Sequence, residues 1–240
     1  MIEAFIWGAV AASPLLIGAL VAYVATPSKT VIAVVMALGA GLLIGSVAFE
    51  LIDEALKTTD VALVGLFTLI GAAAFTGGDR LLESQGGGDR KDADGAQESG
   101  SPLAIVFGSV LDGIPESFVL GLTVLQGGVS VALVVGILLS NLPEGLSSSS
   151  GLRIAGWARA RVVRMWLVVI VVAAVSAALG YALLDPASGR TGALAQGFAA
   201  GALLAMITDT MLPEAYDVER VSTGSLVAIG FAVSLMLSAI

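Results

Sequence analysis

Long apolar runs follow one another along almost the whole chain, and they limit the folds that are open to it. Of its 240 residues, 57% are hydrophobic and only 12% are charged, with a mean hydropathy of +0.99. In soluble domains about a quarter of all residues are charged, so this composition is typical of a membrane protein. The runs have the length of about 20 residues that a membrane-spanning helix needs, and they lack the alternation of barrel strands. We therefore predict an all-α membrane protein, with residues 1–240 forming a single transmembrane domain.

Eight membrane-spanning helices are predicted, and the basic residues indicate their orientation. The predicted helices cover residues 2–24, 30–56, 61–77, 102–125, 129–146, 162–184, 192–212 and 222–240. Cytoplasmic loops are enriched in lysine and arginine. With the N-terminus outside, these loops receive nine of the eleven basic residues: Lys29, Arg80, Arg90, Lys91, Arg153, Arg159, Arg161, Arg164 and Arg220. We therefore expect a multi-pass protein of the cell (plasma) membrane, with both termini outside.

The segment 78–101 is the one long polar stretch. It is rich in Gly, Asp, Glu, Gln and Ser, and such a composition cannot bury enough apolar surface to fold. We predict a flexible cytoplasmic loop here. The net charge of −8 gives no basis for binding nucleic acid, and the absence of cysteine excludes disulfides and thiolate metal sites.

Two of the predicted helices resemble each other. GLLIGSVAFELIDEA from Gly41 and GALLAMITDTMLPEA from Gly201 match in their glycine, leucine, glutamate and alanine positions. With eight helices, the second runs outward and the seventh runs inward, so the repeat would be inverted. Inverted repeats are common in secondary transporters, and this likeness favours transport.

A second likeness relates the fourth and fifth predicted helices. GSVLDGIPES from Gly108 and GILLSNLPEG from Gly136 share glycine, leucine, proline and glutamate at the same spacing. Proline removes an amide donor inside a helix and frees a carbonyl in the preceding turn. A charged glutamate in hydrocarbon costs at least about 2.5 kcal/mol. A short turn at 126–128 makes the two helices antiparallel, so we expect both Pro-Glu steps at similar depth.

Each Pro-Glu step has further polar residues on the same helix face. Residues four apart share a face, so Asp112 accompanies Glu116, and Ser140 accompanies Glu144. Buried carboxylates in a membrane need compensation by a cation or by protons. The sequence therefore predicts a site for a divalent metal ion, formed by Asp112, Glu116, Ser140, Asn141 and Glu144.

At these residues the chain resembles the ZIP (Zrt/Irt-like) family of divalent metal transporters. LDGIPES and SNLPEGL are similar to the family's fourth- and fifth-helix motifs, which typically read His-Asn-x-Pro-Glu-Gly and a closely related sequence. The resemblance implies eight helices in a 3+2+3 arrangement, with helices 1–3 and 6–8 related as an inverted repeat, and a homodimer. It also implies transport of divalent cations into the cytoplasm, without a prosthetic group, through a site between helices four and five.

Several positions depart from the family pattern. Asp112 stands where a histidine is usual, Gly113 replaces the motif asparagine, and Ser117 replaces the motif glycine. Ser140 takes a ligand position that a better donor fills elsewhere. A second metal position would lack the amide lost at Gly113, and the predicted helix 162–184 offers no carboxylate to complete it, so we expect one metal site and not two. The chain has no histidine at all, and an all-oxygen ligand set suits manganese, although zinc also accepts carboxylates. Zinc is the first expectation from the resemblance, and manganese, iron and cadmium are the others.

Two further acidic residues are predicted to take part, and two other functions remain as alternatives. Glu50, near the outer end of the second helix, and Asp209, in the seventh, are predicted along the path of the cation. Trp157 and Trp166 flank an arginine-rich loop and are predicted to anchor it at the membrane interface. A non-transporting metal-binding sensor and an intramembrane hydrolase are the alternatives. The hydrolase is disfavoured because His-Glu-x-x-His and Gly-x-Gly-Asp motifs are absent, so we expect no enzyme.

Overall fold

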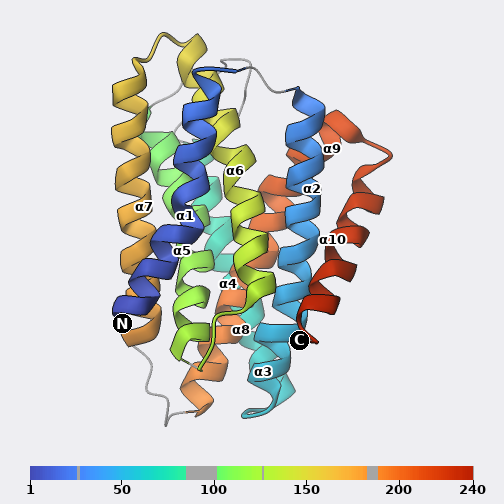
Figure 1. Cartoon of the computed structure of the whole chain (residues 1–240). Coiled ribbons are helices and arrows are strands. Elements are labelled where there is room, and N and C mark those ends of the chain that lie inside the picture. The colour runs from blue at the N-terminus through green and yellow to red at the C-terminus, as the bar shows by residue number, and fades with distance from the viewer. Residues whose placement is uncertain (26–27, 85–101, 126, 183–188, 240) are drawn as a thin grey trace.

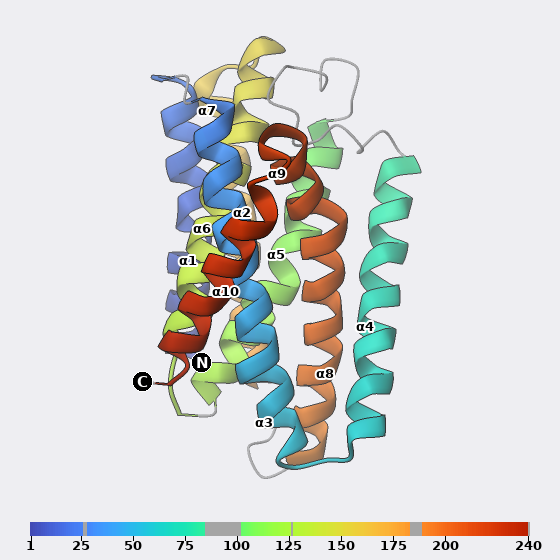
Figure 2. The ribbon, with the colours of Figure 1, turned by 90° about the vertical axis from the view of Figure 1, so that its right-hand side faces the viewer.

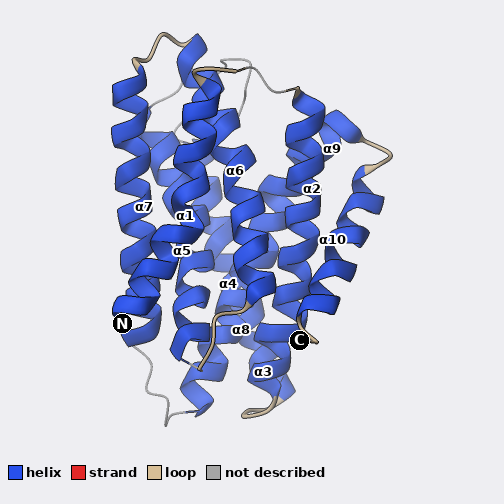
Figure 3. Cartoon of the chain, viewed as in Figure 1, coloured by secondary structure: helices blue, strands red, loops and turns tan. Residues whose placement is uncertain are grey.

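The computed structural model describes residues 1–25, 28–84, 102–125, 127–182 and 189–239, and every regular element in these ranges is a helix (Figure 3). The elements are α1 (Ile2–Ala22), α2 (Lys29–Ser46), η1 (Val47–Ile52), α3 (Asp53–Leu56), α4 (Val61–Leu82), α5 (Pro102–Leu125), α6 (Val131–Ile154), α7 (Arg159–Ala182), α8 (Gly189–Met206), η4 (Ile207–Met211), α9 (Leu212–Glu219) and α10 (Thr223–Leu237). The two η elements are π-helical turns. Each of them continues the helix before it into the helix after it.

The length and apolar character of the helices indicate a multi-pass membrane protein. Within the described ranges, seven helical segments are long and apolar enough to cross a bilayer. The last helix, α10, is also apolar but has 15 residues, which is about 22 Å of helix. The helices run up and down between two ends of the bundle, and both termini lie at the same end (Figure 1). The all-helical prediction is confirmed.

The helix ends separate the basic residues into the two predicted groups. Arg153 and Arg159 flank the connection between α6 and α7, at the end away from the termini, whereas Lys57 follows α3 at the end where the termini lie. The predicted loop at 78–101 starts later than expected, because α4 continues through Leu82. The remainder of that predicted loop, residues 85–101, lies outside the described ranges.

Side-chain caps fix where three of the helices begin. The Ser28 hydroxyl accepts from the Val31 N–H at the start of α2, and the Asp60 carboxylate accepts from the Ala62 N–H at the start of α4. Ser130 does the same for α6 by accepting from the Leu133 N–H. Such caps satisfy backbone donors that have no partner inside the helix. They set the register of each helix from its first turn.

The described helices pack as one group of four and two pairs. In the group α1 packs on α6 and α7, and α5 packs on α7; the pairs are α2 with α10 and α4 with α8. Figure 2 shows α4 and α8 side by side at the edge of the bundle. The α2–α10 pair joins the group mainly where α2 lies on α6, and the α4–α8 pair joins it where α5 lies on α8. Helices α5 and α6 contact each other only sparingly.

Glycines allow the closest helix contacts, and these contacts come in matching pairs. A Cβ atom on Gly41 would collide with the Val227 carbonyl of α10, and one on Gly201 would collide with the Thr68 carbonyl of α4. Gly41 and Gly201 are the glycines that the sequence comparison aligned. The π-helical turns η1 and η4 follow these two glycines at corresponding positions of the aligned segments. Single π-helical turns are rare and frequently occur at functional sites.

Two sequence predictions in this region are wrong. Helix α6 does not end at Leu146 but continues through the serine run to Ile154, because the serines lie against neighbouring helices and not in solvent. Trp166 is not an interfacial anchor, since it is fully buried and its indole N–H donates to Ser149 Oγ at 2.8 Å. Trp157 lies in the α6–α7 connection, where the Arg161 guanidinium stacks 4.1 Å above its ring.

Candidate functional site

The two Pro-Glu steps lie inside the bundle, on α5 and α6. Both helices continue through their prolines, Pro115 and Pro143. Asp112 and Glu116 are each 3% exposed and Glu144 is 7% exposed. Three carboxylates are thus buried in membrane-spanning helices, where charged groups are costly and usually functional.

A serine hydroxyl connects the two helices at this level. Ser140 Oγ of α6 lies 3.2 Å from Glu116 Oε1 of α5 and 3.0 Å from the carbonyl oxygen of Ile137 in its own helix. The hydroxyl has one hydrogen and can donate to only one of these acceptors at a time. Ser140 therefore lies beside Glu116 of the other helix, and its hydroxyl can donate either to that carboxylate or to its own backbone.

Asn141 is turned toward a helix that the sequence did not connect with the site. Its Nδ2 donates to the Ala11 carbonyl of α1 at 2.9 Å, and the side chain is buried. The carbonyl oxygen of the amide is the only atom of this side chain that can bind a cation, and the bond to α1 fixes which way that oxygen points.

The structure does not bring the predicted ligands into one shell. Among the residues with described side chains, no three acidic side chains are arranged so that they could hold a metal ion. Coordination of one ion by Asp112, Glu116 and Glu144 requires α5 and α6 to bring their carboxylates closer together. Helix α7 contains no acidic residue, and its Ser176 hydroxyl donates to the Ile114 carbonyl at 3.1 Å.

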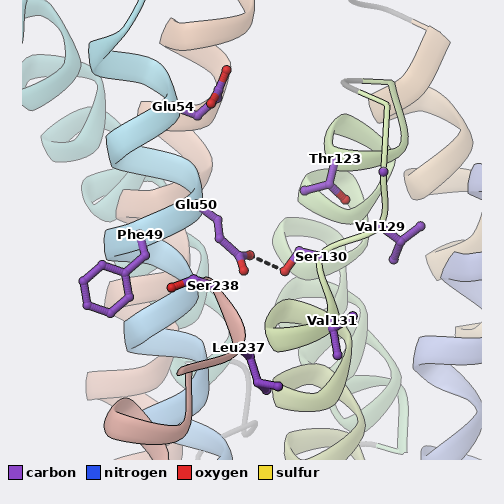
Figure 4. A pocket seen from close by; sticks show the side chains of 10 residues that line it. Phe49, Glu50, Glu54, Thr123, Val129, Ser130, Val131, Leu237 and Ser238 are labelled. Atoms are coloured by element: carbon purple, nitrogen blue, oxygen red, sulfur yellow. Dashed lines mark hydrogen bonds between the residues drawn. The ribbon is translucent and has the colours of Figure 1, made fainter. Parts of the chain in front are cut away.

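Glu50 lies in a pocket that opens at the end of the bundle where the termini lie. The pocket has a volume of about 740 Å³ and is lined by Phe49, Glu50, Glu54, Thr123, Gly128, Val129, Ser130, Val131, Leu237 and Ser238. We call it the outer pocket, because it lies at the end of the bundle that the distribution of basic residues predicts to face outside. Figure 4 shows the Glu50 carboxylate reaching from η1 across to Ser130, whose hydroxyl donates to Glu50 Oε2. The structure thus places Glu50 at an opening, as the prediction of an entrance residue requires.

Asp209 does not face the buried carboxylates. It is exposed in η4, and its Oδ2 accepts from the Thr76 hydroxyl of α4 at 3.1 Å. This side chain is directed to the edge helix α4 and not to α5 or α6. Nothing in the described part of the chain connects it with Glu116 or Glu144, and its predicted place on the cation path gains no support.

Two polar groups near the site were not predicted. Ser130 could have been found, because a serine shortly after two glycines and before an apolar run is a typical helix start. The Ala11 carbonyl has no sequence signal, since any residue supplies a backbone oxygen. Ser148, four residues after Glu144, shares its helix face, as the spacing indicates; it is fully buried, and its Oγ has no hydrogen-bond partner among the described residues.

A comparison with known protein families and with curated proteins finds no match for this chain.

Proposed function

We propose that this protein transports divalent metal cations across the cell membrane into the cytoplasm, through a site between α5 and α6. Glu116 and Glu144 supply the principal charge, and Asp112, Ser140 and Asn141 complete the ligand shell. Zinc is the first candidate ion, and manganese, iron and cadmium are the others. The protein is proposed to act without a prosthetic group and as a homodimer, with both termini outside.

The burial of three carboxylates on two apolar helices carries this proposal. A structural role would be served at lower cost by apolar side chains, because a buried charge must be compensated. Oxygen ligands with two or three negative charges are the usual partners of divalent cations. The Ser140 hydroxyl of α6 already lies 3.2 Å from the Glu116 carboxylate of α5, so the two helices meet at the level of the site.

The proposal includes a 3+2+3 architecture in which helices 1–3 and 6–8 form an inverted repeat. Exchanging α1 with α7, α2 with α8 and α4 with α10 turns the α2–α10 contact into the α8–α4 contact. The same exchange carries the Gly41–Val227 contact onto the Gly201–Thr68 contact and η1 onto η4. These correspondences support a pseudo-twofold relation between the two segments.

Metal uptake into proteoliposomes tests the proposal. We expect the wild-type protein to accumulate zinc, and the same assay with manganese, iron and cadmium ranks the ions. Glu116→Gln and Glu144→Gln keep the volume of each side chain but remove one negative charge beside a divalent ion. Each should weaken binding at least tenfold, or about 1.4 kcal/mol. Glu3→Gln, at an exposed position in the first turn of α1, is the matched control.

The outcomes separate the alternatives. Uptake at the wild-type rate by correctly inserted Glu116→Gln and Glu144→Gln proteins would refute the site. Metal binding without accumulation in the wild type would indicate a sensor and refute transport.

A further inference from the structure

One hydrogen bond joins opposite walls of the outer pocket. Glu50 belongs to η1, in the helix that begins at Lys29, whereas Ser130 begins α6 after the turn that follows α5. The hydroxyl of Ser130 donates to the carboxylate across the pocket (Figure 4). This contact therefore joins the two walls at the pocket, whereas α2 and α6 pack directly on each other further along, where Gly136 lies on Leu43.

Ser130 makes two hydrogen bonds at once, and they do not compete. Its oxygen accepts from the Leu133 N–H at 3.0 Å, and its single hydrogen is given to Glu50. The capping bond holds the hydroxyl in place on α6. Through this bond the Glu50 carboxylate of η1 lies beside the N-terminus of the 24-residue helix α6. The dipole of α6 stabilises a negative charge there.

We propose that Ser130 is a positioning residue that holds Glu50 across the outer pocket, and that this bond has to break before a cation moves on to the α5–α6 site. The inference rests on the proposed transport function and adds the step at which the pocket opens. A divalent cation attracts a carboxylate by full charge, whereas the serine hydroxyl is a neutral donor. A cation that binds the Glu50 carboxylate can therefore displace the Ser130 hydroxyl. Binding of the transported ion itself then breaks the hydrogen bond across the pocket.

The test uses a single cysteine below the pocket, which is possible because the chain contains none of its own. Ser140→Cys places a thiol nine residues after Val131, about 14 Å further along α6. Its reaction rate is measured with a small cationic, membrane-impermeant thiol reagent applied from the side of the termini. Ser130→Gly is added because glycine is tolerated as an N-cap but cannot donate to Glu50. Ser130→Thr keeps both the cap and the donor.

We expect Ser130→Gly to raise the reaction rate at least about tenfold, the change that follows from losing a hydrogen bond to a charged group. Ser130→Thr should react at the rate of the Ser140→Cys parent. Ser238→Gly is the matched control, since Ser238 lines the same pocket outside the Glu50–Ser130 bond, and it should also leave the rate unchanged.

Equal rates in all variants, or an equal rise with Ser238→Gly, would overturn the role of Ser130. No reaction in any variant would overturn it as well, because the pocket would then not lead to Ser140. Zinc uptake by the wild type is measured separately. If the wild type takes up no zinc, the transport proposal is refuted. The thiol reaction rates test the role of Ser130 independently of that result.

Discussion

Replacing Gly201 by alanine should destabilise the protein by about 1–2 kcal/mol. The added Cβ would collide with the Thr68 carbonyl of α4, and real Cβ atoms essentially never approach another heavy atom within 3.0 Å. The two helices have to separate, and overpacking of this kind costs about 1–3 kcal/mol. Alanine returns about 0.5–1 kcal/mol through its better helix propensity. Gly41→Ala should cost the same, because its Cβ would meet the Val227 carbonyl in the matching contact.

The unfolding temperature of the purified protein in detergent measures this effect. At this chain length 1 kcal/mol corresponds to about 2–4 °C, so both variants should melt about 2–8 °C lower. Gly65→Ala is the control, since Gly65 is an exposed glycine of α4 with no atom within 4 Å of its Cβ position. It should melt at or slightly above the wild-type temperature. A Gly201→Ala protein as stable as Gly65→Ala would refute the close contact, and unequal losses for Gly41 and Gly201 would count against the repeat.

Two further predictions concern selectivity and orientation. Asp112→His should shift uptake toward zinc over manganese in a competition assay, because imidazole favours zinc; an unchanged ratio would refute this account of selectivity. Single cysteines at Gly189 and Ala158, which lie exposed at opposite ends of the bundle, should react with an impermeant maleimide from opposite sides of the membrane. Gly189 should react from outside in intact cells, and the reverse result would turn the proposed transport direction around.

The sequence predicted the helices well where one local property determined them. Apolar length placed α5 at Pro102–Leu125 and the end of α3 at Leu56, as the structure has them. The end of α6 was predicted too early because the boundary was set where the apolar run ends at Leu146, before the four serines. Serine is tolerated inside a helix when its hydroxyl finds a partner on another helix, as Ser149 does with Trp166.

The directions of the polar side chains could not be predicted, because they depend on how each helix is rotated against its neighbours. Spacing placed Ser140 and Glu116 at one level, and they lie within hydrogen-bonding distance. Spacing alone gave no sign that Asn141 bonds to Ala11 on α1, or that Asp209 bonds to Thr76 on α4. Both contacts join residues more than a hundred positions apart, and no local pattern encodes them.

The deep burial of α6 has a consequence for how the protein enters the membrane. In an 18-residue stretch of α6 with a mean hydropathy of 1.4, 72% of the residues are buried, whereas the corresponding stretch of α7 has a mean hydropathy of 2.5 and 44% of its residues are buried. Alone in lipid, α6 would expose Asn141, Glu144 and its serines to hydrocarbon, where each polar group costs free energy. Once α1 and α2 pack on it, these groups no longer face lipid. We therefore expect α6 to remain beside the insertion machinery until neighbouring helices have been made, so that its insertion and its packing are one event.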